Sequence, residues 1–166
     1  MSALPQFRFR EATASDAAAI RSVVFSVLAE YGLSPDADGI DADLNDVASS
    51  YGERGGSFRV VTSLDGRVVG CGGLYPLTES DAEIRKMYLL REARGLGLGR
   101  ALLDELIALA TERRFKRVVV ETAAVLKEAI SLYRRRGFVP FAHDHLAKRC
   151  DQAYVLNLAG DVSRVG

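Results

Sequence analysis

The fold of this chain is decided by one stretch, Arg94-Gly95-Leu96-Gly97-Leu98-Gly99-Arg100. Alternating glycines leave a turn without side chains, so backbone N–H groups can approach an anion closely. An apolar, strand-prone run from Ile84 to Leu90 comes before it, and leucines at helical spacing follow it. A strand, a glycine loop and a helix in this order bring free amides and the positive end of a helix dipole to one point. The stretch therefore predicts a phosphate-binding site.

Three phosphate-binding motifs compete for this stretch. The P-loop requires Lys followed by Ser or Thr after its glycines, and neither pair follows here. The dinucleotide fingerprint fails because in either register its last place holds a large residue, although Glu121 lies near the place of its ribose-binding acid. The third motif, Arg-x-x-Gly-x-Gly, is met by Arg94, Gly97 and Gly99. A plain tight turn into a helix is the alternative without a ligand.

Length and composition limit the class of protein. A chain of 166 residues, 48% of them hydrophobic, predicts one globular domain over residues 1–166. A net charge of zero argues against a nucleic-acid partner. The sequence shows no membrane-spanning run and no signal-peptide pattern, so we expect no membrane partner and a cytoplasmic location. Two cysteines, Cys71 and Cys150, are too few for a disulfide framework and suit a reducing compartment.

Hydrophobic periodicity predicts a mixed α/β (α+β) chain with the element order βααβββαβαββ. The strand, glycine loop, helix and strand around residue 97 imply one parallel pair, and the remaining strands are expected to be antiparallel. The predicted strands are Phe7–Arg10, Phe58–Ser63, Arg67–Tyr75, Asp81–Leu90, Arg117–Glu121, Phe138–Ala142 and Ala153–Leu158. The predicted helices follow Thr13, run over residues 40–51, follow Gly97 and begin near Leu126.

The strand before the glycine loop loses its alternation. Ile84 is apolar, and then the four consecutive residues from Met87 to Leu90 are all apolar. A one-residue β-bulge would explain this change of period. A bulge leaves backbone donors outside the ladder, which is useful in an active site.

A second motif follows the strand after the loop. It reads Ala129-x-x-x-Tyr133-x-x-x-Gly137-Phe138 and lies on the predicted helix near its glycine end. With Arg94-x-x-Gly97-x-Gly99, it makes the sequence similar to the GNAT superfamily, the acyl-CoA-dependent N-acyltransferases. The specific part of the resemblance spans Glu83 to Phe138, and the element order extends it over nearly the whole chain. One departure is Leu126, at a place where the family often has an Asn that contacts the cofactor.

The resemblance implies a fold, a reaction and a set of site residues. The fold is a mixed, mostly antiparallel sheet flanked by helices. The reaction moves an acetyl group from acetyl-CoA to an amine, by direct transfer in a ternary complex, and a homodimer is possible because family members are frequently dimers. The implied cofactor-binding residues lie on the bulged strand and the glycine loop: Met87, Tyr88, Leu89, Arg94, Gly95, Leu96, Gly97, Leu98, Gly99 and Arg100.

The chemistry of acyl transfer requires three further groups. A protonated amine must lose its proton, the oxyanion needs fixed donors and the leaving thiolate benefits from an acid. Glu83 is the candidate base, with a solvated strand acid as its alternative. Met87 to Leu89 can supply the donors. Tyr133 is the candidate acid, with simple packing on a helix face as its alternative.

Other polar residues leave alternatives open. His143 and His145 could line the acceptor site or replace the base, and no metal site is expected. Cys150 could be a nucleophile in a two-step transfer. The acids between residues 36 and 46 either favour a helix dipole or form a negative rim that attracts a cationic amine. The rival functions are a noncatalytic acyl-CoA-binding domain and a dinucleotide-binding oxidoreductase. Zero net charge favours a small amine over basic protein tails.

Overall fold

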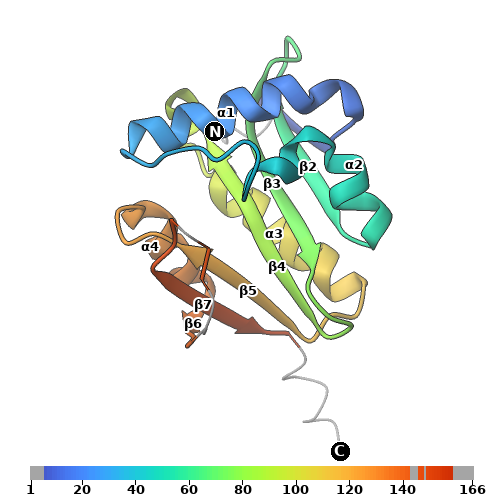
Figure 1. The fold of residues 1–166 in the computed structure, drawn as a ribbon, viewed down its shortest axis with the longest axis vertical. Helices are drawn as coiled ribbons and strands as arrows, with labels where there is room; N and C mark the ends of the chain where they lie inside the picture. Colours follow the sequence, from blue (N-terminus) through green and yellow to red (C-terminus); the bar gives the residue numbers. More distant parts are fainter. Residues whose placement is uncertain (1–5, 143–145, 148, 159–166) are drawn as a thin grey trace, which may run out of the picture.

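The computed structural model describes residues 6–142, 146–147 and 149–158, and one seven-stranded sheet runs through them. The strands lie in the order β1-β2-β3-β4-β5-β7-β6 (Figure 1). Among the described strands, the β4–β5 pair is parallel and every other pair is antiparallel, which confirms the predicted mixed sheet. A doubly wound parallel sheet, as the dinucleotide-binding rival requires, is thereby excluded for this part of the chain. The strands are β1 Phe7–Glu11, β2 Ser57–Ser63, β3 Val68–Pro76, β4 Asp81–Leu89, β5 Arg117–Thr122, β6 Val139–Pro140 and β7 Gln152–Asn157.

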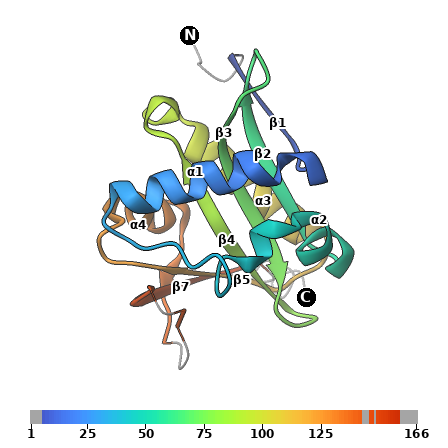
Figure 2. The ribbon, with the colours of Figure 1, turned by 45° about the horizontal axis from the view of Figure 1, so that its top comes forward.

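Helices cover both faces of the sheet (Figures 1 and 2). One face carries α1 (Ala17–Glu30) and the short α2 (Val47–Ser50), and the other carries α3 (Leu98–Glu112) and α4 (Lys127–Arg136). Adjacent residues of β2 show the two cores directly, because Val60 packs with α1 and α2 whereas Val61 packs with α3. None of the helices in the described residues is both long and apolar enough to cross a membrane.

Two predicted elements are shorter in the structure. The prediction of a single helix over residues 40–51 is wrong. The segment instead forms the short α2, flanked by two 3-10 helices, Ala42–Asn45 and Gly52–Arg54. Asp46 interrupts the helix with φ of −153°, and its carboxylate caps α2 by accepting a 3.1 Å hydrogen bond from the Ser49 N–H. In the last hairpin, β6 has two residues instead of the five expected, and Phe141 adds one further hydrogen bond from its N–H to the Ala153 carbonyl at 2.9 Å.

A β-bulge at Lys86 interrupts β4, as the sequence predicts. Cys71 pairs with Tyr88 and Gly73 with Arg85, so β4 has one residue more than β3 over this interval. Lys86 takes a positive φ of 55°. Ala82 and Ile84 face the α3 core before the bulge and Met87 and Leu89 face it afterwards, since the extra residue changes the parity. The predicted bulge is therefore confirmed.

The two parallel strands pair over only part of their length. Residues Asp81–Ile84 of β4 pair with Arg117–Val120 of β5, and the pairing ends there. Beyond Ile84, β4 continues beside β3 while β5 continues beside β7. The strands therefore diverge at the bulge and leave a gap through the centre of the sheet.

Candidate active site

A cavity of about 1190 Å³ lies at this gap, and residues from elements on both faces of the sheet line it. It is lined by β4 from Glu83 to Leu89, the end of β5, the glycine loop, one side of α4 and the C-terminal end of α1. Its volume exceeds the range of about 300–1,000 Å³ that is usual for a single small-molecule site. The cavity therefore has room for two ligands that meet between β4 and β5.

The glycine loop forms one end of this cavity. Gly95 and Gly97 have φ of 75° and 84°, values that side-chain-bearing residues rarely adopt, and Gly97 is the N-cap of α3. The 15-residue α3 leaves its first N–H groups without acceptors in the helix. Gly95, Gly97, Gly99 and Arg100 line the cavity, so the free amides and the positive end of the helix dipole lie at its edge.

Two residues of the predicted loop do not line the cavity. Leu98 is 1% exposed and packs into the α3 core, so it can offer a ligand only its backbone. Leu96 is 38% exposed on the outer surface of the loop. The side chains in this stretch thus alternate between core and solvent, while the glycines face the cavity.

Arg94 is held by protein groups. Its Nη1 and Nη2 donate to the Glu30 carboxylate of α1 at 2.5 and 2.9 Å, and its Nε donates to the Leu89 carbonyl at 3.0 Å. The guanidinium also lies 5.6 Å from the centre of the Tyr31 ring. These contacts tie the start of the glycine loop to α1 and to the end of β4.

The strand edge beyond the bulge supplies backbone donors to the cavity. Three residues of this edge line the cavity: Met87, Tyr88 and Leu89. Because β5 diverges after Val120, none of the described strands pairs with the edge of β4 that faces the gap along these residues. N–H groups on such an edge are available to a carbonyl oxygen that develops negative charge.

Glu83 lies where β4 and β5 begin to separate. It is 4% exposed, lines the cavity and accepts a hydrogen bond from Arg85 Nε. Burial raises the pKa of the Glu83 carboxyl, the Arg85 charge opposes this shift and the neighbouring Glu121 carboxyl adds to it. Glu83 is thus a buried acid beside the gap, and the solvated strand acid considered from the sequence is excluded.

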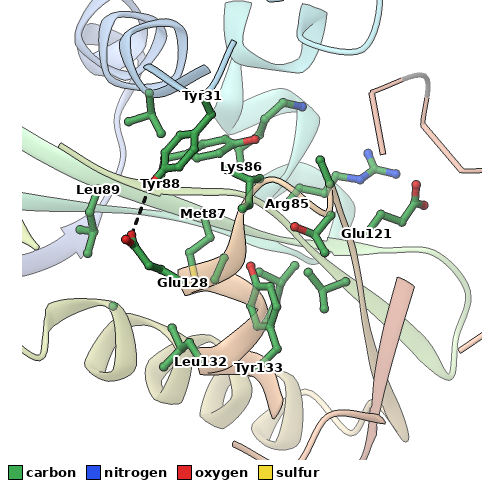
Figure 3. Close-up of a pocket in the computed structure, with 18 of the residues that line it drawn as sticks. Tyr31, Arg85, Lys86, Met87, Tyr88, Leu89, Glu121, Glu128, Leu132 and Tyr133 are labelled. Atoms are coloured by element: carbon green, nitrogen blue, oxygen red, sulfur yellow. Dashed lines mark hydrogen bonds between the residues drawn. The ribbon is translucent and has the colours of Figure 1, made fainter. Parts of the chain in front are cut away.

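Tyr133 approaches the cavity from the opposite face. It lies on α4, is 4% exposed and packs against the Phe138 ring with the centroids 5.6 Å apart. Figure 3 shows its hydroxyl pointing from α4 toward the cavity, on the side of Met87. Burial raises the pKa of this hydroxyl far above its usual value, with smaller contributions from Tyr88 and Cys150. The ring thus belongs to the core, whereas the hydroxyl faces the cavity.

Sequence reasoning missed several residues that shape the cavity. Arg85 follows Glu83 by two residues, the spacing that puts strand residues on one face, so alternation could have placed it beside the candidate base. Tyr31 donates a 3.2 Å hydrogen bond to Glu128 and so joins α1 to α4 (Figure 3). No local signal connects two residues 97 positions apart. Leu126 also lines the cavity, where it offers only apolar contact.

Two acids of the segment between residues 36 and 46 are paired with cations of the protein itself. Asp41 is fully buried and accepts hydrogen bonds of 2.8 and 2.6 Å from Arg149. Asp43 accepts from Lys86 Nζ at 3.0 Å and from the Tyr51 hydroxyl. These pairs fasten the segment onto the bulge, so at Asp41 and Asp43 the functional alternative considered from the sequence is wrong.

The other candidate nucleophile and bases can be placed only in part. Cys150 lines the cavity and is half-buried, and burial raises the pKa of its thiol to about 11. His143 and His145 lie outside the described residues.

Comparison with known proteins gives a consistent result. Residues 26–138 match the model of the acetyltransferase (GNAT) family. Over 134 residues the chain is 42% identical to the uncharacterized N-acetyltransferase YjgM of Escherichia coli K12, covering 78% of this chain and 80% of that protein. The fold is similar to a GNAT-family acetyltransferase from Staphylococcus aureus Mu50, with a TM-score of 0.86 at 22% identity over 91% of this chain and 98% of that one. It is also similar to a phosphinothricin acetyltransferase from Sinorhizobium meliloti, solved in complex with acetyl-CoA, with a TM-score of 0.74 at 21% identity over 95% and 91% of the two chains.

Proposed function

Because the chain belongs to the acetyltransferase (GNAT) family, we propose that it transfers the acetyl group of acetyl-CoA directly to a primary amine of a small molecule. One observation carries this proposal: a single cavity joins the N-terminus of α3 to a buried carboxylate, Glu83, through the gap between β4 and β5. An anion site at one end and a proton acceptor at the other suit a phosphate-bearing donor and an amine.

The glycine loop is proposed to hold the pyrophosphate of acetyl-CoA. The residues present fit this group, because Gly95 and Gly97 adopt positive φ and a Cβ built at either meets no atom within 4 Å in the described part of the chain. The amides of Leu98, Gly99 and Arg100 begin α3 and are the donors for the phosphate oxygens. The thioester arm would then extend along β4 toward the bulge.

Glu83 and Tyr133 are proposed to carry protons at the two faces of the gap. Glu83 accepts a proton from the attacking amine, directly or through water, since a free alkylammonium has a pKa of about 10.4 and is otherwise charged. N–H groups of β4 near Met87 stabilise the developing oxyanion. The Tyr133 hydroxyl gives a proton to the leaving thiolate, and its raised pKa keeps it protonated at neutral pH.

The protonation of the two cysteine thiols favours direct transfer over a mechanism with an acyl-enzyme intermediate. Burial raises the pKa of Cys71 to about 12 and that of Cys150 to about 11, so both are thiols at neutral pH. Acylation of either would need a base to remove its proton first. The test is amine-dependent release of the CoA thiol from acetyl-CoA; binding of acetyl-CoA without release in the presence of any amine would overturn the proposal.

A further inference from the structure

The end of the cavity opposite the glycine loop carries an arginine, Arg85, whose guanidinium is only partly used by hydrogen bonds within the described residues. Figure 3 shows Arg85 and Glu121 pointing toward the same end of the cavity, away from the Tyr31–Glu128 hydrogen bond. Glu83 and Arg85 lie two residues apart on β4, before the bulge, and so share the face of the sheet that α1 covers. This end of the cavity holds the candidate base Glu83, so it is the end at which we place the acceptor.

The guanidinium of Arg85 is fixed in orientation. Its Nε donates to Glu83, and its Cζ lies 3.7 Å from the centre of the Tyr75 ring. The side chain is 32% exposed. Stacking and the Nε hydrogen bond hold the plane of the group, so a ligand would bind it with little further loss of side-chain entropy.

The two Nη groups of Arg85 have no acceptor among the residues that the structure describes. Two other arginines that line the cavity, Arg94 and Arg149, differ in this respect. Arg94 uses both Nη groups on Glu30, and Arg149 uses both on Asp41. Arg85 uses only Nε, which leaves a planar pair of donors at the acceptor end of the cavity.

A carboxylate is the group that such a pair of donors fits, because two parallel N–H···O bonds match its geometry. Glu83 is bonded to Nε of the same guanidinium, so it lies beside any carboxylate held by the Nη groups. An amine one or two carbons from that carboxylate would reach Glu83. Glu121 adds a second carboxyl group beside Glu83, and one of its oxygens accepts the Ala147 N–H at 2.7 Å.

We propose that Arg85 binds the carboxylate of the acceptor, and that the acceptor is an α-amino acid or a close analogue. This inference rests on the proposed function and names the substrate class of the same site. It separates amino acids from polyamines, aminoglycosides and the N-terminal amines of proteins, all of which lack a carboxylate next to the amine.

The test compares matched acceptors that differ only in the carboxylate. Several amino acids with aliphatic, aromatic and polar side chains are compared with their α-amides and with the corresponding decarboxylated amines, and kcat/KM is measured with acetyl-CoA. Charged hydrogen bonds are worth about 1.5–3 kcal/mol, so we expect the wild type to prefer the acid by about 10- to 100-fold. Equal rates for acid and amide in the wild type would overturn the inference while leaving the proposed function intact.

A variant then assigns the preference to Arg85. In Arg85→Met the preference for acid over amide should fall toward one, mainly through KM, and Arg85→Lys should restore only part of it because the planar fork is lost. Arg8→Met, a change at an exposed arginine of β1, is the matched control and should keep the wild-type ratio. A retained acid preference in folded Arg85→Met would contradict the assignment. If Arg85→Met fails to fold, the ratio of kcat/KM for acid over amide in Arg85→Lys, compared with the wild-type ratio, still tests whether Arg85 binds the carboxylate. Acetyl-CoA binding with no acetylation of any amine would sink the proposed function, and this inference with it.

Discussion

Arg94 donates hydrogen bonds from both of its Nη atoms to the Glu30 carboxylate, at 2.5 and 2.9 Å. These bonds connect the start of the glycine loop to the last residue of α1. This pairing predicts that Arg94 acts on acetyl-CoA by holding the loop in place. Arg94→Ala should weaken acetyl-CoA binding by about tenfold, the lower range for a charged hydrogen bond. Calorimetry on Arg94→Ala, Glu30→Ala and the double variant measures the coupling.

The double-mutant cycle separates two roles of Arg94. If the residue holds the loop through Glu30, the two single losses should be similar and the double variant no worse than either. Tighter acetyl-CoA binding in Glu30→Ala would show instead that Glu30 competes with a phosphate for Arg94.

Gly97 and Gly99 should respond differently to alanine. Gly97 has φ of 84°, so Gly97→Ala strains the backbone by about 1–2 kcal/mol and pulls the N-cap of α3 out of place. Gly99 has no such φ, and a Cβ there would meet Leu132 and Leu89 at an ordinary 3.5 Å. We expect Gly97→Ala to weaken acetyl-CoA binding strongly and Gly99→Ala to weaken it far less. Equal losses of acetyl-CoA affinity in the two variants, measured by calorimetry, would show that the positive φ of Gly97 is not what the loop requires.

Glu83→Gln should abolish the acidic limb of the pH–rate profile. A base must be ionised to accept a proton, so activity should rise with pH as Glu83 loses its own proton. Because burial raises the pKa of Glu83, this limb should lie above the usual range of a glutamate. In Glu83→Gln turnover should fall by about 10²–10⁴-fold and the limb should vanish. A variant that keeps both turnover and limb would transfer the base role to another group.

The strand β4 and the loop after it show which features the sequence can predict and which it cannot. The glycine loop and the bulge can be predicted because each has a local signal in the sequence. The loop is marked by three closely spaced glycines, and the bulge by a change in the alternation of apolar residues along one strand. Arg85 could not be assigned so readily, since a polar residue two places from an acid on a strand is ordinary until its stacking on Tyr75 is known. The Tyr31–Glu128 bond depends wholly on how α1 and α4 meet.

In the region from residue 40 to 54, the sequence predicts which residues are buried but not the secondary structure. Its apolar spacing correctly predicts that Leu44, Val47 and Tyr51 are buried. It does not predict that the helix is broken, because Asp46 caps α2 and Asp41 is drawn into pairs with Arg149 and Lys86. Long-range charge pairs override local helix propensity there.

Tyr133→Phe distinguishes packing from catalysis. The ring contact with Phe138 survives the change, so the melting temperature and acetyl-CoA affinity should hold. If the hydroxyl protonates the leaving thiolate, turnover should fall by about 10²-fold or more. The loss should shrink with an acyl donor whose thiol is more acidic, since a better leaving group needs less protonation. Wild-type turnover in this variant would leave Tyr133 with a packing role alone.

The central claim is direct transfer of an acetyl group to an amine, and one measurement tests it most directly. The wild type is mixed with isotope-labelled acetyl-CoA, with and without a panel of primary amines that includes amino acids, while thiol release and the masses of enzyme and product are followed. We predict amine-dependent thiol release, a labelled N-acetyl product and an enzyme that stays unlabelled when no amine is present. Acetyl-CoA binding without thiol release for any amine would contradict the account in favour of a noncatalytic binding domain, and a label on Cys150 in the absence of amine would contradict direct transfer.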